Sequence, residues 1–112
     1  MVTVRDLKTV DDFHEFINEK DGKVRIVKLS APWCGPCRVL AETIKGLDRD
    51  KIGDTLFAEI NIDTDETEEI GVECNIRGVP VLLYYKDGIE RVRSLGAVPS
   101  DDIYENIEKL LC

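Results

Sequence analysis

The stretch Trp33-Cys34-Gly35-Pro36-Cys37 carries the strongest signal in this chain, because thiols separated by two residues can close into a disulfide and reopen. Mostly apolar residues 24–30 before it predict a strand, and apolar side chains at helical spacing in residues 40–47 after it predict a helix. Cys34 then lies at a helix N-terminus, where unpaired amides favour an anion such as a thiolate. This placement predicts Cys34 as the nucleophile and Cys37 as the resolving thiol.

Length and composition predict one globular domain over residues 1–112. The chain is long enough to bury a core, and its 43% apolar and 34% charged residues are typical of a water-soluble protein. We expect no signal peptide and no membrane span, which favours a cytoplasmic protein without membrane partners. A net charge of −8 argues against nucleic-acid binding, which needs a basic surface.

Alternating periodicities predict five strands and four helices in the order β-α-β-α-β-α-β-β-α. One helix is expected after a Thr9/Asp12 capping box, and a second begins at Cys34. A third is expected over residues 66–74, and a fourth follows a Ser100 cap. The strands are expected at residues 2–4, 24–30, 56–62, 81–85 and 90–95, the last two joined by the turn Lys86-Asp87-Gly88. Right-handed crossovers then predict an α/β fold with a central mixed sheet, helices on both faces and an antiparallel hairpin at its end.

Five ordered segments resemble the thioredoxin family, and the resemblance runs nearly end to end. They are Trp33 to Cys37, Asn61-Ile62-Asp63, Ile76-Arg77-Gly78-Val79-Pro80, Lys86-Asp87-Gly88 and Gly96-Ala97. The resemblance implies the thioredoxin fold and a protein dithiol–disulfide oxidoreductase. In that scheme the Cys34 thiolate attacks a substrate disulfide, and Cys37 resolves the mixed disulfide.

The resemblance also implies a substrate groove around the redox pair. Its residues are Trp33, Gly35, Pro36, Val79, Pro80, Gly96 and Ala97. The Gly35-Pro36 pair lets a substrate approach and stiffens the loop. A cis Val79-Pro80 bond, as in the family, would expose the Val79 backbone opposite Cys34 for pairing with an extended substrate.

A family member of this kind binds no cofactor and receives its electrons indirectly. The resemblance implies a thioredoxin reductase, a flavoprotein drawing on NADPH, and disulfide-containing substrate proteins as partners of a monomer. The alternative function is a redox-independent partner-binding module that uses the groove around Trp33, Val79 and Pro80. A Cys34→Ser variant that kept full partner function would favour the module.

Two charges behind the cysteines depart from the family pattern. The family usually has a buried Asp six residues before the nucleophile, where this chain has Lys28, and the common partner Lys is here Glu59. If their strands pair, the charges have changed places and compensate each other, because a lone buried Lys is costly. In one interpretation Glu59 accepts the Cys37 proton, directly or through water. In the other, the pair is a salt bridge without a catalytic role.

The remaining candidates are weaker. Cys74 stands where some family members carry a regulatory thiol, but a small apolar side chain at a helix end is the favoured interpretation, because no neighbouring residue marks an activated thiol. His14 has polar neighbours and is expected to be solvated. No metal site is expected, because the cysteines lack the paired spacing of zinc modules. The acidic residues 63–69 lack the spacing of a calcium loop and predict a charged helix start.

Overall fold

A computed structural model describes residues 1–111 and shows five strands and five helices. The strands are β1 (Val4–Leu7), β2 (Val24–Ser30), β3 (Leu56–Asn61), β4 (Val81–Lys86) and β5 (Ile89–Leu95). The helices are α1 (Val10–Ile17), α2 (Gly35–Lys45), α3 (Arg49–Ile52), α4 (Glu68–Glu73) and α5 (Ser100–Leu111). The predicted fold class and mixed five-stranded sheet are confirmed.

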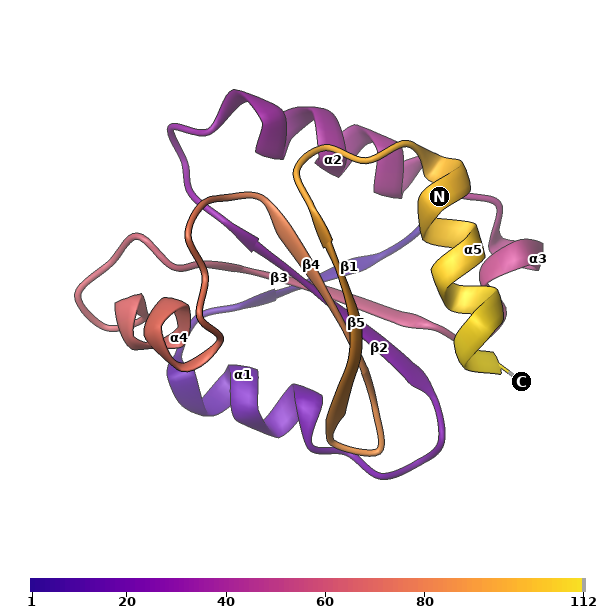
Figure 1. The fold of residues 1–112 in the computed structure, drawn as a ribbon, viewed down its shortest axis with the longest axis horizontal. Coiled ribbons are helices and arrows are strands. Elements are labelled where there is room, and N and C mark those ends of the chain that lie inside the picture. Colours follow the sequence, from indigo (N-terminus) through magenta and orange to yellow (C-terminus); the bar gives the residue numbers. More distant parts are fainter. Residues whose placement is uncertain (112) are drawn as a thin grey trace.

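The five strands form one sheet in the order β1-β3-β2-β4-β5 (Figure 1). β1, β3 and β2 run parallel to one another, whereas β4 pairs antiparallel with both β2 and β5. The predicted hairpin closes through Asp87 and Gly88, which both have positive φ angles of 52° and 81°. Asp-Gly is the pair that such a tight turn favours, because both central residues need that conformation.

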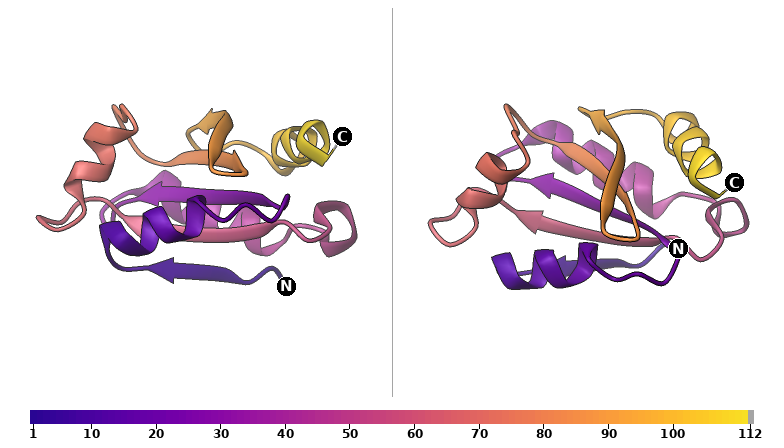
Figure 2. Two further views of the ribbon diagram at one scale, coloured as in Figure 1. Left: turned by 90° about the horizontal axis from the view of Figure 1, so that it is seen from below. Right: turned by 60° about the horizontal axis from the view of Figure 1, so that its bottom comes forward.

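Helices cover both faces of the sheet, with α1 and α4 on one side and α2, α3 and α5 on the other (Figures 1 and 2). Side chains of β2 alternate between the two layers, because successive residues of a strand point to opposite faces. Val27 and Leu29 join the core under α1 and α4, whereas Val24 and Ile26 join the core under α2 and α5. Lys28 therefore points to the α2 side, the side that carries the cysteines.

Helix α1 begins with the capping box predicted from its sequence. The Thr9 hydroxyl accepts a hydrogen bond from the Asp12 amide at 3.0 Å, and the Asp12 carboxylate accepts from the Thr9 amide at 3.1 Å. The backbone amides of Lys8 and Thr9 lower the pKa of Asp12. The carboxylate therefore stays ionised to a lower pH than usual, and this contribution to stability disappears as the pH falls through the lowered pKa.

Replacing Thr9 by alanine is expected to lower the free energy of unfolding by about 1 kcal/mol, because one first-turn amide loses its acceptor. Chemical denaturation of the purified protein measures this loss. Thr9→Ser keeps the hydroxyl and is the matched control. An equal loss in both variants would contradict the capping role.

Several elements differ from prediction: β3 ends at Asn61 rather than at residue 62, α4 spans Glu68–Glu73 rather than residues 66–74, and β4 and β5 are each one residue longer. A fifth helix, α3, follows α2; its first turn is capped by the Asp48 side chain, which accepts from the Asp50 amide at 2.9 Å. Four residues are too short to show a helical period, so the sequence pattern missed it. The first strand spans Val4–Leu7 rather than residues 2–4, because Val2 packs into the core beyond the end of the β1–β3 ladder. Ser100 is the first residue of α5 rather than its cap.

Candidate active site

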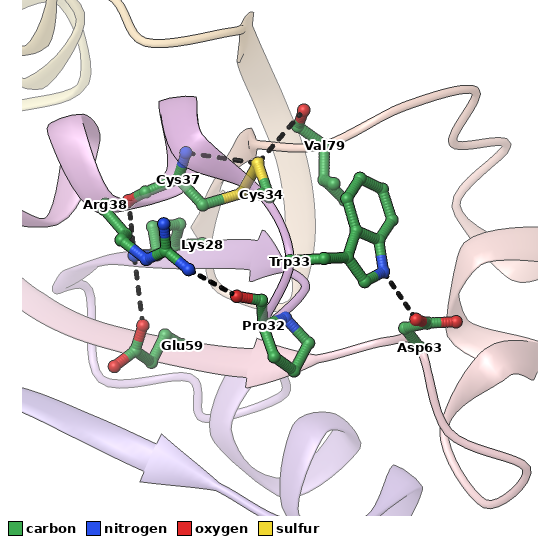
Figure 3. The surroundings of a disulfide bond; sticks show 9 residues. All are labelled: Lys28, Pro32, Trp33, Cys34, Cys37, Arg38, Glu59, Asp63 and Val79. Carbon is green, nitrogen blue, oxygen red and sulfur yellow. Dashed lines mark hydrogen bonds and ion pairs between the residues drawn. A yellow bond between two sulfur atoms is a disulfide. The ribbon is translucent and has the colours of Figure 1, made fainter.

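The disulfide lies where strand β2 leads into helix α2, as predicted (Figure 3). Cys34 caps α2, and its sulfur accepts a hydrogen bond from the Cys37 amide at 3.1 Å. Cys34 and Cys37 are joined through their sulfur atoms, and each residue is only 3% exposed. A helix N-terminus and an aimed amide both stabilise negative charge on sulfur, so the local structure favours Cys34 as the attacking thiolate once the pair is reduced.

Val79 faces the disulfide from the loop before β4. Its carbonyl oxygen lies 3.7 Å from Cys34 Sγ, and its side chain packs against Ala31 and the two cysteines. The Val79-Pro80 peptide bond is cis, as the family resemblance implied. Gly96 lies beside it, since its amide donates to the Pro80 carbonyl oxygen at 2.9 Å. Its φ of 82° favours glycine, and a Cβ there would meet no atom within 4 Å.

The expected groove residues separate into two groups. Val79, Pro80 and Gly96 line a cavity of about 460 Å³, and Val79 also packs against the two cysteines. The other four expected residues do not line this cavity and are exposed on the surface: Trp33, Gly35, Pro36 and Ala97. The structure thus places a substrate-sized hollow on the Val79 side of Cys34.

Trp33 is 68% exposed and is held in place by a carboxylate that the sequence analysis did not assign a role. Its indole Nε1 donates to Asp63 Oδ2 at 2.6 Å (Figure 3). Asp63 follows β3, whose carboxyl end lies beside the end of β2 in the parallel ladder. That adjacency is the signal that could have identified the pair, because carboxyl ends of parallel strands meet at one edge.

Arg38 also contributes to this loop, although no sequence pattern indicated this role. Its guanidinium Nη2 donates to the Pro32 carbonyl oxygen at 3.1 Å (Figure 3). The bond ties the first turn of α2 to the segment that precedes the cysteines, which restricts movement of the loop that presents Cys34.

Lys28 and Glu59 are directly paired across β2 and β3, as the assumed strand pairing requires. Lys28 Nζ lies 3.1 Å from Glu59 Oε2 and also donates to the Cys37 carbonyl oxygen at 3.2 Å. The Lys28 side chain is 5% exposed and that of Glu59 is 39% exposed. The buried ammonium therefore lies between the backbone of Cys37 and a carboxylate that water can reach (Figure 3).

Cys74 lies in the core at the C-terminus of α4, away from the disulfide. It is 7% exposed, and burial raises the pKa of its thiol. Its neighbour Tyr85 also has a raised pKa because it is buried beside Cys74. This environment favours the neutral thiol and the structural interpretation of Cys74 over a reactive, regulatory one.

We expect the native Cys74 thiol to react with iodoacetamide at least about tenfold more slowly than the same thiol in the urea-unfolded chain. The raised pKa lowers the thiolate fraction near neutral pH, and burial excludes the reagent. Mass spectrometry of peptides from protein with its disulfide intact measures the two rates. Equal labelling in both states would contradict the burial of this thiol.

His14 was expected to be solvated, but it has a partner. Its Nε2 lies 2.8 Å from a carboxylate oxygen of Glu73, which links α1 to α4 on the face opposite α2. Within residues 1–111, no group of three His, Cys, Asp or Glu side chains is arranged to hold a metal ion. No helix in the same part of the chain is long and apolar enough to cross a membrane. Cys112 lies outside the described residues.

Comparison with known proteins agrees with this geometry. The family model described as Thioredoxin matches residues 4–109, so the chain belongs to the thioredoxin family. It is 36% identical over 110 residues to the chloroplastic M-type thioredoxin of Spinacia oleracea, covering 96% of this chain and 59% of that protein. It is 29% identical over 108 residues to the thioredoxin of Gallus gallus, covering 96% and 99% of the two chains.

A solved structure shows the same fold. The X-ray structure of Fasciola hepatica thioredoxin aligns with a TM-score of 0.80 at 32% identity, covering 95% of this chain and 98% of that one. The chain spans between 48% and 59% of the length of the chloroplastic M-type relatives from Spinacia oleracea, Triticum aestivum and Pisum sativum.

Proposed function

We propose that this protein is a dithiol–disulfide oxidoreductase that reduces disulfides of other proteins. The observation that carries the proposal is the Cys34–Cys37 disulfide at the N-terminus of α2, with the Val79 carbonyl 3.7 Å from Cys34 Sγ. A reactive sulfur beside an available backbone carbonyl suits an extended protein segment better than a small molecule, because the segment can pair with that backbone.

The reaction transfers two electrons in two exchanges. The Cys34 thiolate attacks one sulfur of a substrate disulfide, forming a mixed disulfide and releasing the other substrate sulfur as a thiolate that takes up a proton. The Cys37 thiol then loses its proton and attacks Cys34 Sγ, which forms the internal disulfide and releases the second substrate thiolate. The substrate is reduced to two thiols, and the protein ends in the oxidised state.

Reduction of insulin tests the proposed activity without any protein partner. With dithiothreitol as the electron source, the protein is expected to shorten the time before reduced insulin precipitates, because it relays electrons faster than the small thiol. Turbidity measures this time. A rate equal to that of dithiothreitol alone would overturn the oxidoreductase proposal and favour the partner-binding module.

We further infer that a flavoprotein reductase drawing on NADPH recharges the oxidised pair, and that the protein acts as a monomer. Family membership and the absence of any cofactor requirement in the thiol exchange support this electron source. When oxidised protein is mixed with NADPH and a purified thioredoxin reductase, NADPH should be consumed, and its absorbance measures this consumption. Failure with reductases of this class would point to another electron donor. Light scattering gives the molar mass in solution and so tests whether the protein is a monomer.

We place the protein in a reducing compartment, the cytoplasm first. The free thiol of Cys74 in the core supports this placement, because structural cysteines are left unpaired most often where thiols stay reduced. The chloroplastic location in the names of several relatives defines the alternative. Fractionation of the source cells with an antibody against the protein distinguishes the two.

We propose in addition that Glu59 receives the proton of Cys37 during the second exchange. The Lys28 ammonium bridges the Cys37 carbonyl and the Glu59 carboxylate, and Glu59 is open to water on its other side. A proton leaving the buried thiol could therefore pass through the pair, or a neighbouring water, to solvent. The alternative is a salt bridge that only neutralises Lys28.

A further inference from the structure

The cavity next to the disulfide is lined by basic residues, although the protein as a whole is acidic. The chain has a net charge of −8, yet the cavity that begins at Val79 is lined by two arginines and by no carboxylate of the described residues. Because Val79 lies against Cys34, a substrate segment bound at the reactive sulfur has these arginines within its reach. Their charge can therefore select among substrates.

The rest of the cavity wall is mostly apolar. Its apolar residues are Ile76, Val79, Pro80, Val81 and Leu95. Leu95 is 72% exposed at the end of β5, so its side chain gains contacts only when another molecule covers it. An extended segment lying on this wall is thereby kept close to any arginine of the cavity whose charge is not already neutralised.

The two arginines differ in whether a carboxylate already neutralises the guanidinium charge. Arg93 forms a bidentate ion pair with Glu90, in which Nε and Nη2 each lie 2.7 Å from a carboxylate oxygen. Its remaining Nη1 donates to the Cys74 carbonyl oxygen at 3.0 Å. Arg93 is therefore part of the structure, with its charge neutralised and its geometry fixed.

Arg77 has no such partner. It is exposed in the loop between α4 and β4, two positions before Val79, and within residues 1–111 it forms neither an ion pair nor a hydrogen bond. A free guanidinium at the edge of an apolar hollow is a good receptor for a carboxylate, because it can donate two parallel hydrogen bonds.

We propose, building on the oxidoreductase function, that Arg77 makes the protein prefer substrate segments with an acidic side chain close to the reactive half-cystine. The segment lies extended along the cavity, with its sulfur at Cys34 and its carboxylate at Arg77. Arg77 lines the same cavity two residues before Val79, and an extended chain advances about 3.3 Å per residue, so we place the carboxylate about two residues from the half-cystine. Segments that carry Lys at this place meet a like charge and react more slowly.

The test uses synthetic peptides closed by a single disulfide, identical except for Glu, Gln or Lys placed two residues to either side of one half-cystine. Reduced protein is mixed with each peptide, and the second-order rate constant of peptide reduction is measured. We expect the Glu peptide to react about fivefold faster than the Gln peptide, and the Lys peptide to react more slowly than both. Raising the salt concentration from about 20 mM to about 500 mM should bring the three rates together.

Two variants assign the preference to Arg77. Arg77→Glu is expected to reverse the order of the Glu and Lys peptides. Arg91→Glu makes the same change in net charge on β5 outside the cavity, and should keep the wild-type order. The proposal is overturned if wild-type protein shows no preference, if the preference survives Arg77→Glu, or if Arg91→Glu also reverses it. If no peptide is reduced at all, the oxidoreductase function itself fails.

Discussion

Replacing Cys34 by serine is expected to abolish the acceleration of insulin reduction, leaving only the rate of dithiothreitol alone. A hydroxyl at this position cannot form the mixed disulfide, and the helix N-terminus then has no thiolate to stabilise. Cys74→Ala removes a thiol outside the site and is the matched control, which should keep full activity. A Cys34→Ser variant that still reduced insulin faster than dithiothreitol alone would contradict the assignment of the nucleophile.

Cys37→Ser separates the two exchanges. The first exchange needs only Cys34, so this variant should form a mixed disulfide with its substrate and then stop, because no thiol is left to resolve it. Electrophoresis without reductant should show the covalent complex, and added dithiothreitol should reduce its mixed disulfide and separate the two chains. If the complex formed in Cys34→Ser and not in Cys37→Ser, the two roles would be exchanged.

The parts of the fold that were predictable are those with strong periodicity or a specific turn. β2 spans Val24–Ser30 as predicted, because a central strand buried on both faces reads as a continuous apolar run. β1 was misplaced because an edge strand pairs on one side only, and its register depends on contact with β3 rather than on its own side chains. The four residues of α3 depend on the Asp48 cap and on burial of Ile52, which no periodic pattern reveals.

The redox pair was predictable because it is local in sequence, whereas its surroundings are not. The contact of Val79 with Cys34 spans 45 residues and was obtained only from the family resemblance. The bond from Trp33 to Asp63 depends on how two strand ends meet. That the Arg77 side chain has no ion-pair partner could not have been predicted from the sequence, because it depends on where the fold places the carboxylates.

The pairing of Lys28 with Glu59 was predicted from charge compensation, but its connection to Cys37 was not. The register of β2 against β3 places the two residues side by side. Only the three-dimensional path of α2 shows that the Lys28 ammonium also reaches the Cys37 carbonyl. The same cation thus contacts the resolving cysteine and the candidate proton acceptor, which gives the second exchange a structural link to Glu59.

Replacing Glu59 by glutamine is expected to slow the second exchange by about tenfold near neutral pH and to leave the first unchanged. Glutamine keeps the size of the side chain and an acceptor oxygen for Lys28, but it cannot take up a proton. A positioned general base typically contributes a hundredfold or more; we expect less, because Glu59 is 39% exposed and water can replace it in part. Loss of the partner charge should also cost about 1–2 kcal/mol of stability, less than for a fully buried pair.

Single-turnover kinetics across a range of pH distinguish the two roles of this pair. If Glu59 accepts the proton, Glu59→Gln changes the pH profile of the second exchange, whereas Glu42→Gln removes a carboxylate from an exposed ion pair on α2 and leaves the profile as it was. Lys28→Met removes the link between Cys37 and Glu59, so its effect and that of Glu59→Gln should be non-additive in the double variant. An unchanged profile in Glu59→Gln, with stability lowered, would show that the carboxylate only neutralises Lys28.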